Sequence, residues 1–225
     1  MSLQVCYGGS FDPVHMGHLA IARAVRDALG ARVALLPAAD PPHKTRTHAP
    51  AADRGAMLEL AVGSEPGLSV DTRELDRPGP SYTVDTLAGL RAAWGPTQPI
   101  AWLLGGDSLH ALESWHRWRT LFELAHVLAV ARPGAPVDMA SLQAQAPGVH
   151  AEIAARHREA GALQRTPAGG FAVLHLPSLR AESSTRVRAL VASGGAWRPL
   201  VPPAVAGYIA SEGLYRRGVP APAPL

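Results

Sequence analysis

Residues 5–19 read Val-Cys-Tyr-Gly-Gly-Ser-Phe-Asp-Pro-Val-His-Met-Gly-His-Leu. The apolar run from Leu3 to Tyr7 predicts a short buried strand, which the following glycine pair ends. From about Gly17, apolar residues recur at helical spacing as far as Gly30, a residue type common at helix C-termini. This part of the chain therefore predicts a strand, a glycine turn and a helix, with two histidines at the helix start.

The two histidines, His15 and His18, are three residues apart and share one face of the first helical turn. A helix start offers N–H groups without intrahelical acceptors and the positive end of the helix dipole, which suits phosphate. Gly17 between them leaves room for a ligand to approach closely. The same histidines with Asp12 would also suit a transition metal, but no further ligand stands out. The glycine pair alone would fit a plain tight turn. Phosphate binding is the favoured prediction.

Composition narrows the function classes. The 225 residues carry a formal net charge of +3 with scattered basic residues, so no nucleic-acid signature is present. The single cysteine, Cys6, falls in the first predicted strand and is interpreted as a small buried apolar side chain. Neither a signal-peptide pattern nor an apolar run of about eighteen residues occurs. We expect a soluble, cytoplasmic protein that acts on neither membranes nor nucleic acid.

Predicted strands and helices alternate along the chain, which indicates an α/β fold with a doubly wound parallel sheet. One domain is expected over residues 1–217, with a small C-terminal helical part at about 183–217 and a disordered tail at 218–225. The further strands are predicted at 32–37, 68–71, 100–104, 126–131 and 171–176. The further helices are predicted at 51–63, 81–94, 181–193 and from 203 onward.

Three local expectations accompany this scheme. Ser81 or Thr83 is expected to cap the helix that starts near residue 81, and Asp107 or Ser108 the one after residue 104. Residues 135–170, rich in Ala, Gln, Gly and Pro, are interpreted as a variable insertion or surface region with a helix at about 149–160.

Polar clusters follow most of the predicted strands. In doubly wound sheets, ligands bind beyond the carboxyl ends of the strands, near the switch point of the topology. The clusters should therefore meet in one composite site. They are residues 8–18, 40–44, 105–107, 132 and 183–188.

Two of these clusters resemble known signatures. Residues 8–18 match the signature of the nucleotidyltransferase superfamily that carries the H-x-G-H motif, and residues 183–188, Ser-Ser-Thr-Arg-Val-Arg, are similar to its second signature. Further elements resemble the bacterial nicotinate mononucleotide adenylyltransferases, and the likeness extends over residues 3–216. These elements are residues 37–44, 81–87, 105–108, Trp115 and 131–134.

The resemblance implies a Rossmann-like nucleotidyltransferase fold and a reaction. ATP and nicotinate mononucleotide would give nicotinate adenine dinucleotide and pyrophosphate, a step of NAD biosynthesis. Mg²⁺ would enter with ATP, because it prefers phosphate oxygens and water to a cage of protein ligands. A protein-held metal is not expected, and a homo-oligomer is left open.

The resemblance also implies roles for individual residues. His15 and His18 would be catalytic, with His18 nearer the α-phosphate of ATP. Trp115 would stack on the pyridine ring, N–H groups near Thr83 and His116 would bind its carboxylate, and Asp107 would bind ribose hydroxyls. The ATP-binding set is Gly8, Gly9, Ser10, Phe11, His15, His18, Gly105, Asp107, Ser183, Ser184, Thr185 and Arg188, with Arg186 as an alternative to Arg188. The set for the other substrate is Lys44, Tyr82, Thr83, Trp115, His116 and Arg132.

This residue set suits the chemistry. A phosphate monoester has a second pKa of about 6, so the attacking phosphate is mostly ionised at neutral pH and needs no general base. The protein has to align the reactants and neutralise the charge on the α-phosphate and pyrophosphate. A carboxylate accepts hydrogen bonds, whereas an amide also needs an acceptor, so we expect the acid nucleotide to be preferred over the amide.

Less specific interpretations remain at this stage. Trp115 would also fit the core, residues 183–185 a plain helix cap, and Lys44 and Arg132 a solvated surface. The acceptor could be nicotinamide mononucleotide, phosphopantetheine or a cytidylyltransferase substrate, and a nucleotide-binding module without turnover is a further alternative. A dinucleotide-binding oxidoreductase is disfavoured, because no G-x-G-x-x-G follows the first predicted strand.

Overall fold

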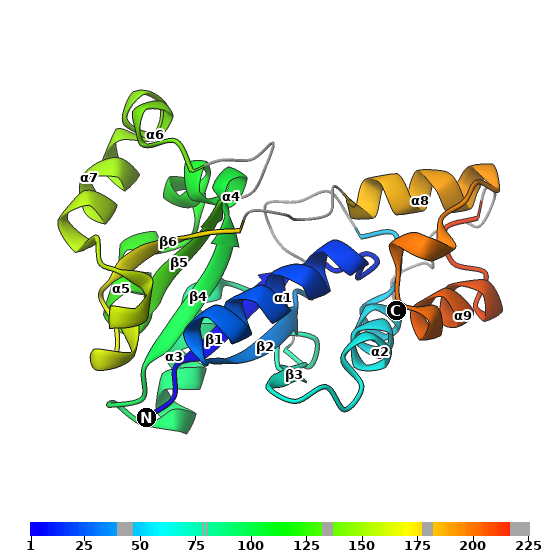
Figure 1. Ribbon diagram of the computed structural model, residues 1–225, viewed down its shortest axis with the longest axis horizontal. Coiled ribbons are helices and arrows are strands. Elements are labelled where there is room, and N and C mark those ends of the chain that lie inside the picture. Colours follow the sequence, from blue (N-terminus) through cyan, green and yellow to red (C-terminus); the bar gives the residue numbers. More distant parts are fainter. Residues whose placement is uncertain (40–46, 78, 80, 132–136, 177–181, 217–225) are drawn as a thin grey trace.

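The computed structural model describes residues 1–39, 47–77, 79, 81–131, 137–176 and 182–216 (Figure 1). Within this part of the chain, six parallel strands form one sheet in the order β3-β2-β1-β4-β5-β6. The strands are β1 (Gln4–Gly9), β2 (Arg32–Pro37), β3 (Leu68–Val70), β4 (Ile100–Gly105), β5 (His126–Ala131) and β6 (Phe171–His175). The strand order reverses between β1 and β4, which is where doubly wound sheets bind ligands. The predicted fold class is confirmed.

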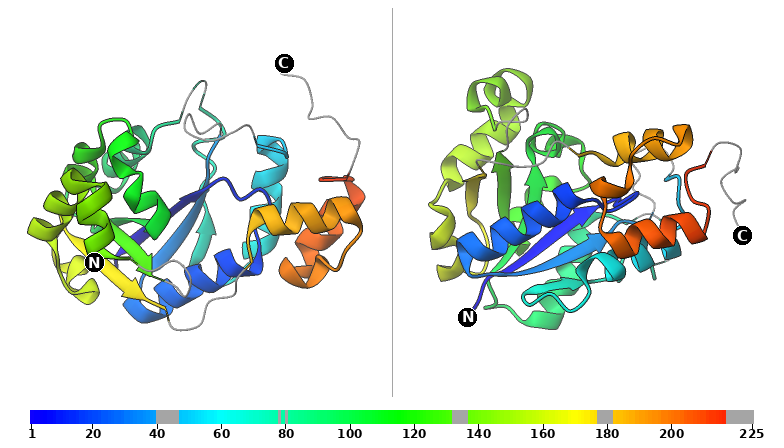
Figure 2. Two further views of the ribbon diagram at one scale, coloured as in Figure 1. Left: turned by 90° about the horizontal axis from the view of Figure 1, so that it is seen from above. Right: turned by 45° about the vertical axis from the view of Figure 1, so that its right-hand side comes forward.

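Helices cover both faces of the sheet and one of its ends. The α-helices are α1 (Met16–Leu29), α2 (Ala51–Val62), α3 (Thr83–Trp94), α4 (Gly106–His110), α5 (Leu121–Leu124), α6 (Met139–Gln145), α7 (Pro147–Arg156), α8 (Ser184–Ser193) and α9 (Pro203–Ser211). The 3₁₀ turns are η1 (Leu112–Ser114), η2 (Trp118–Thr120), η3 (Ala160–Arg165) and η4 (Arg198–Leu200). Helix α9 packs against α2, and α8 lies at the same end of the molecule, away from α6 and α7 (Figure 2).

The core lies on both sides of the sheet, because side chains alternate between its faces. In β1, Val5 packs into the cluster formed with α1, α2, α8 and α9, whereas Cys6 packs into the cluster formed with α3, α5 and α7. Burial raises the pKa of the Cys6 thiol to about 12, so this cysteine is the small buried side chain that the sequence predicts.

Several predicted boundaries are confirmed. Strands β2 and β5 occupy the predicted residues, and Pro203 opens α9. Helix α1 ends at Gly30, which adopts a φ of 56°, a left-handed conformation that favours glycine. Ser183 is the N-cap of α8, and its hydroxyl oxygen accepts the N–H of Arg186 at 3.2 Å.

The expected caps of α3 and α4 are wrong. Tyr82 and Gly105 occupy the two N-cap positions, and neither makes a side-chain capping bond. Thr83 and Asp107 already lie inside their helices, where a side-chain oxygen no longer faces the first N–H groups.

Residues 137–170, the described part of the segment interpreted as a variable insertion or surface region, are largely exposed but also contribute to the core. Helix α7 overlaps the predicted helix at 149–160 and packs against β6 and η1, while α6 packs on α7 (Figure 1). Four side chains of this segment are fully buried: Leu142, Val149, Ile153 and Leu163. Abundant alanine hides this narrow apolar stripe in the sequence. Among the described residues, no helix is long and apolar enough to cross a membrane.

Candidate active site

Two cavities open at the carboxyl ends of β1 and β4, the position that the strand order predicts. One has a volume of about 250 Å³ and lies toward α1 and α8. The other has a volume of about 600 Å³ and lies toward α3 and η1. Both are lined by Tyr7, His18, Leu103, Leu104 and Gly105, so these residues form the boundary between the two cavities.

Two helix starts converge on the smaller cavity. His15, Gly17 and His18 reach it from the first turn of α1, and Ser183 and Ser184 from the start of α8. Neither first turn contains an acidic residue. Both helices therefore direct N–H groups and positive dipole ends toward the same space, which is an arrangement suited to an anion.

The two histidines are held against each other. Their ring centroids are 3.7 Å apart with an interplanar angle of 25°, and the backbone N–H of His15 donates to Nδ1 of His18 at 3.3 Å. Because Nδ1 accepts this bond, the proton of the neutral His18 ring sits on Nε2. His18 can therefore act as a hydrogen-bond donor through Nε2.

Phe11 supports His18. Its ring is almost fully buried and meets the imidazole edge to face, with centroids 4.9 Å apart. Phe11 also packs edge to face on Tyr7 at 5.5 Å and adopts a φ of 47°. Phe11 is predicted to bind ATP, but it lines neither cavity; the structure shows it packing behind the histidine.

The larger cavity is lined by four of the residues predicted to bind the pyridine nucleotide: Tyr82, Thr83, Trp115 and His116. Tyr82 and His116 face each other across 4.5 Å between ring centroids. Trp115 lines the cavity and is only half-buried, whereas Trp118 is buried in the core. The alternative that Trp115 is simply a core residue is therefore disfavoured.

The predicted ATP-binding residues are divided between the two cavities. Gly8, Gly9, Ser10 and Asp107 line the larger cavity, while Ser183 and Ser184 line the smaller one, with His18 and Gly105 on both. A Cβ on Gly8 would overlap the indole of Trp102, so this glycine is required for packing as well as for access to the cavity.

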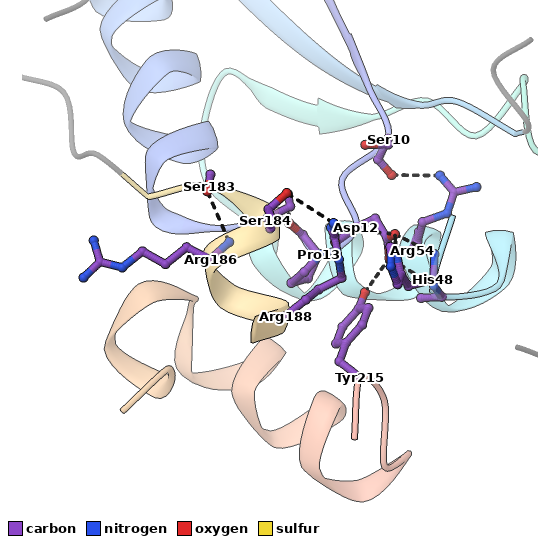
Figure 3. A network of polar contacts seen from close by, with 12 residues as sticks. Ser10, Asp12, Pro13, His48, Arg54, Ser183, Ser184, Arg186, Arg188 and Tyr215 are labelled. Carbon is purple, nitrogen blue, oxygen red and sulfur yellow. Dashed lines mark hydrogen bonds and ion pairs between the residues drawn. The ribbon is translucent and has the colours of Figure 1, made fainter. Parts of the chain in front are cut away.

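Two further predicted ATP-binding residues, Thr185 and Arg188, line neither cavity. Arg188 points toward the loop before α1, where its guanidinium donates to the backbone carbonyl of Asp12 at 2.6 Å (Figure 3). Arg186 extends away from this loop and is exposed (Figure 3). Lys44 and Arg132 lie outside the described residues, as does the segment at 218–225.

Comparison with known proteins identifies the family of this chain. The family described as Cytidylyltransferase-like matches residues 6–190. A Stenotrophomonas maltophilia protein named "Probable nicotinate-nucleotide adenylyltransferase" is 54% identical over 98% of this chain and 100% of its own length. A protein of the same name from Laribacter hongkongensis is 50% identical over 96% of this chain and 95% of its own. The chain belongs to the nicotinate-nucleotide adenylyltransferase family.

A solved structure supports the fold of this family member. The nicotinic acid mononucleotide adenylyltransferase of Plasmodium falciparum, solved with NaAD, superposes with a TM-score of 0.70. Their sequences are 16% identical, and the superposition covers 96% of this chain and 98% of the other. The Rossmann-like nucleotidyltransferase fold is thereby confirmed.

Sequence reasoning missed two acidic residues at the site. Glu182 precedes α8 and lines the smaller cavity. Glu74 lines the larger one, is 5% exposed and accepts the Thr86 hydroxyl at 2.7 Å. Burial raises the pKa of the Glu74 carboxyl. Glu182 adjoins the second signature and could have been found there, whereas Glu74 lies in a charged run that gives no such signal.

Proposed function

We propose that this protein transfers AMP from ATP to nicotinate mononucleotide and releases pyrophosphate. The position of His18 carries the proposal, because this residue lies between a cavity suited to a triphosphate and one suited to a pyridine nucleotide. In adenylyl transfer, the acceptor phosphate must meet the α-phosphate of ATP. The boundary between the two cavities is the place where such a meeting occurs.

The larger cavity is suited to a pyridine carboxylate. Helix α3 starts at Thr83 on its wall, so first-turn N–H groups and a positive dipole end lie beside Tyr82, His116 and Trp115. N–H donors match a carboxylate, whereas the amide of nicotinamide would also require an acceptor. Trp115 would supply the aromatic face for the ring. These features favour the acid nucleotide as acceptor.

The smaller cavity would hold the triphosphate. The first-turn amides of α1 and α8 face it as donors, whereas the Ser184 hydroxyl is already donated to the carbonyl of Pro13. Nε2–H of His18 would donate to an α-phosphate oxygen and stabilise the negative charge that increases there during transfer. No proton has to be removed from the acceptor phosphate, which arrives largely ionised. The site therefore has only to align the two substrates and to stabilise the negative charge on the transferred phosphate.

Mg²⁺ would be bound through ATP. No cluster of three or more His, Cys, Asp or Glu side chains placed for a metal occurs among the described residues. Mg²⁺ readily binds phosphate oxygens while keeping several waters, and when bound it neutralises charge on the triphosphate. The convergent helix starts on the smaller cavity can accept such a complex without contributing a protein ligand.

Pyrophosphate release with ATP tests the proposal. We expect turnover with nicotinate mononucleotide and a much lower kcat/KM with nicotinamide mononucleotide, phosphopantetheine or a cytidylyltransferase acceptor. Equal rates with the acid and the amide would overturn the assigned acceptor. ATP binding without pyrophosphate release from any acceptor would instead indicate a nucleotide-binding module.

A further inference from the structure

The loop before α1 is held by a buried carboxylate that the reaction itself does not use. Asp12 is 3% exposed, and its Oδ1 accepts the N–H of Ala49 at 3.0 Å and the hydroxyl of Tyr215 at 2.8 Å. Its Oδ2 accepts the N–H of His48 at 2.7 Å, and Nδ1 of the same histidine lies 3.3 Å away. Figure 3 shows that His48 and Tyr215 approach Asp12 from separate parts of the chain.

The same loop is hydrogen-bonded to residues of α8. The Ser184 hydroxyl donates to the carbonyl of Pro13 at 2.9 Å, and Arg188 donates to the carbonyl of Asp12 at 2.6 Å (Figure 3). The Arg188 guanidinium also lies 4.0 Å from the Asp12 carboxylate. His15 follows Pro13 by two residues, so these bonds join the two helix starts that line the smaller cavity.

We propose that Asp12 is a positioning residue for ATP, and that the hydroxyl of Tyr215 holds its carboxylate in place. This inference rests on the proposed function. Asp12 sets the separation between the starts of α1 and α8, and this separation decides whether both helices can reach one triphosphate. Tyr215 fixes Oδ1, which leaves Oδ2 directed toward His48 and Arg188.

The charge environment agrees with this arrangement. Burial raises the pKa of the Tyr215 hydroxyl, and the neighbouring Asp12 carboxylate raises it further, so the tyrosine stays protonated and donates. Arg188 and Arg54 lie near enough to oppose this shift. Arg54 holds the preceding part of the same loop, donating to the carbonyl of Ser10 at 2.8 Å.

The chain supplies a matched control. The Tyr208 hydroxyl donates to the Asp53 carboxylate, also at 2.8 Å, between α9 and α2. Tyr215→Phe and Tyr208→Phe therefore each delete one tyrosine–carboxylate hydrogen bond, but only the first deletion touches the loop before α1. Because Asp12 is buried and Asp53 is only half-buried, the general loss of stability should be larger in Tyr215→Phe, so the comparison rests on the ATP-specific change.

We would measure three quantities for the full-length wild type and both variants. They are the Kd of a non-hydrolysable ATP analogue, the KM of each substrate, and the thermal unfolding midpoint. For Tyr215→Phe we expect the Kd of the analogue and the KM for ATP to rise by up to about tenfold, because a carboxylate that has lost one hydrogen bond holds the loop less firmly in its ATP-binding position. The KM for nicotinate mononucleotide should stay within about twofold of wild type. Tyr208→Phe should leave the Kd of the analogue and the KM of each substrate unchanged.

The outcomes separate this inference from the proposed function. If Tyr215→Phe weakens the ATP analogue no more than Tyr208→Phe does, the positioning role is overturned. The positioning role is also overturned if Tyr215→Phe raises the KM values of both substrates equally. If the wild type releases no pyrophosphate, the proposed function fails, while analogue binding still tests Asp12 and Tyr215. Asp12→Asn, which keeps the size of the side chain, should reproduce the ATP-specific loss to a larger extent.

Discussion

The imidazole rings of His15 and His18 stack with their centroids 3.7 Å apart. The Phe11 ring meets the His18 ring edge to face, with the ring centroids 4.9 Å apart. With Nδ1 bonded to the backbone, the His18 ring has little freedom to rotate. Its Nε2–H is thus oriented before any substrate arrives, which is what electrostatic stabilisation of a transition state requires.

Replacement of this histidine should mainly affect turnover. We expect His18→Ala to lower kcat by about 10²–10³-fold, the loss typical of one donor to a transition-state oxyanion. Steady-state pyrophosphate release, with circular dichroism as a check of folding, measures this. His175→Ala, at an exposed site on β6, is the control. A loss of less than about tenfold in His18→Ala would contradict the catalytic role.

The two neighbouring tryptophans should respond differently. Trp115→Ala should raise the KM for nicotinate mononucleotide by up to about tenfold, because aromatic stacking contributes about 0.5–1.5 kcal/mol. The KM for ATP should be unchanged. Trp118→Ala should instead lower the free energy of unfolding by about 3–5 kcal/mol, since this side chain is only 7% exposed. A Trp115 variant with normal KM values would refute stacking.

The glycine at the end of β1 should be sensitive to a single methyl group. Gly8→Ala places a Cβ against the Trp102 indole, so we expect the free energy of unfolding to fall by about 1–3 kcal/mol. Urea denaturation measures the change. Combining it with Trp102→Leu should recover part of the loss, because the smaller side chain makes room. If Trp102→Leu recovers none of the loss, the contact with the Trp102 indole is not the reason that Gly8→Ala is less stable.

His126 should make the stability depend on pH. It is fully buried at the start of β5; its Nδ1 accepts the N–H of Gly170 at 2.8 Å, and its Nε2 lies 2.8 Å from the carbonyl of Thr166. Burial lowers the pKa of this imidazole in the folded state. The unfolded chain binds the proton near pH 6.5, so stability is complete above about pH 6.5 and is lost as the pH falls through the folded pKa.

Urea midpoints at about pH 7.5 and 5.5 would show this loss. His126→Gln should reduce the difference between the two midpoints, while His175→Gln should not, because residue 175 is exposed. An unchanged difference in His126→Gln would mean that other groups cause the acid sensitivity.

The sheet was largely predictable from sequence, because buried parallel strands are apolar runs bounded by glycine and proline. Residues 126–131 are such a run, and all six are buried in β5. The helix starts at 83 and 106 were harder to predict. Several polar residues near each start could serve as a cap, and the backbone geometry that selects among them is not visible in the sequence.

The candidate site was predictable to the extent that its residues follow strand ends. His15, His18, Ser183 and Trp115 all line the cavities for that reason. What the sequence did not reveal are side chains that support the site from elsewhere. The bond between Tyr215 and Asp12 spans 203 residues and follows no local spacing, so only the folded chain brings the two together.

That bond also has a consequence for synthesis on the ribosome. Translation proceeds from the N-terminus, so Asp12 emerges 203 residues before the tyrosine that donates to it. The strands of the sheet can pair during that interval, but the loop before α1 acquires its full set of bonds only after residue 215 has left the exit tunnel. With the positioning role proposed for Asp12, tight ATP binding is therefore expected only after residue 215 has emerged.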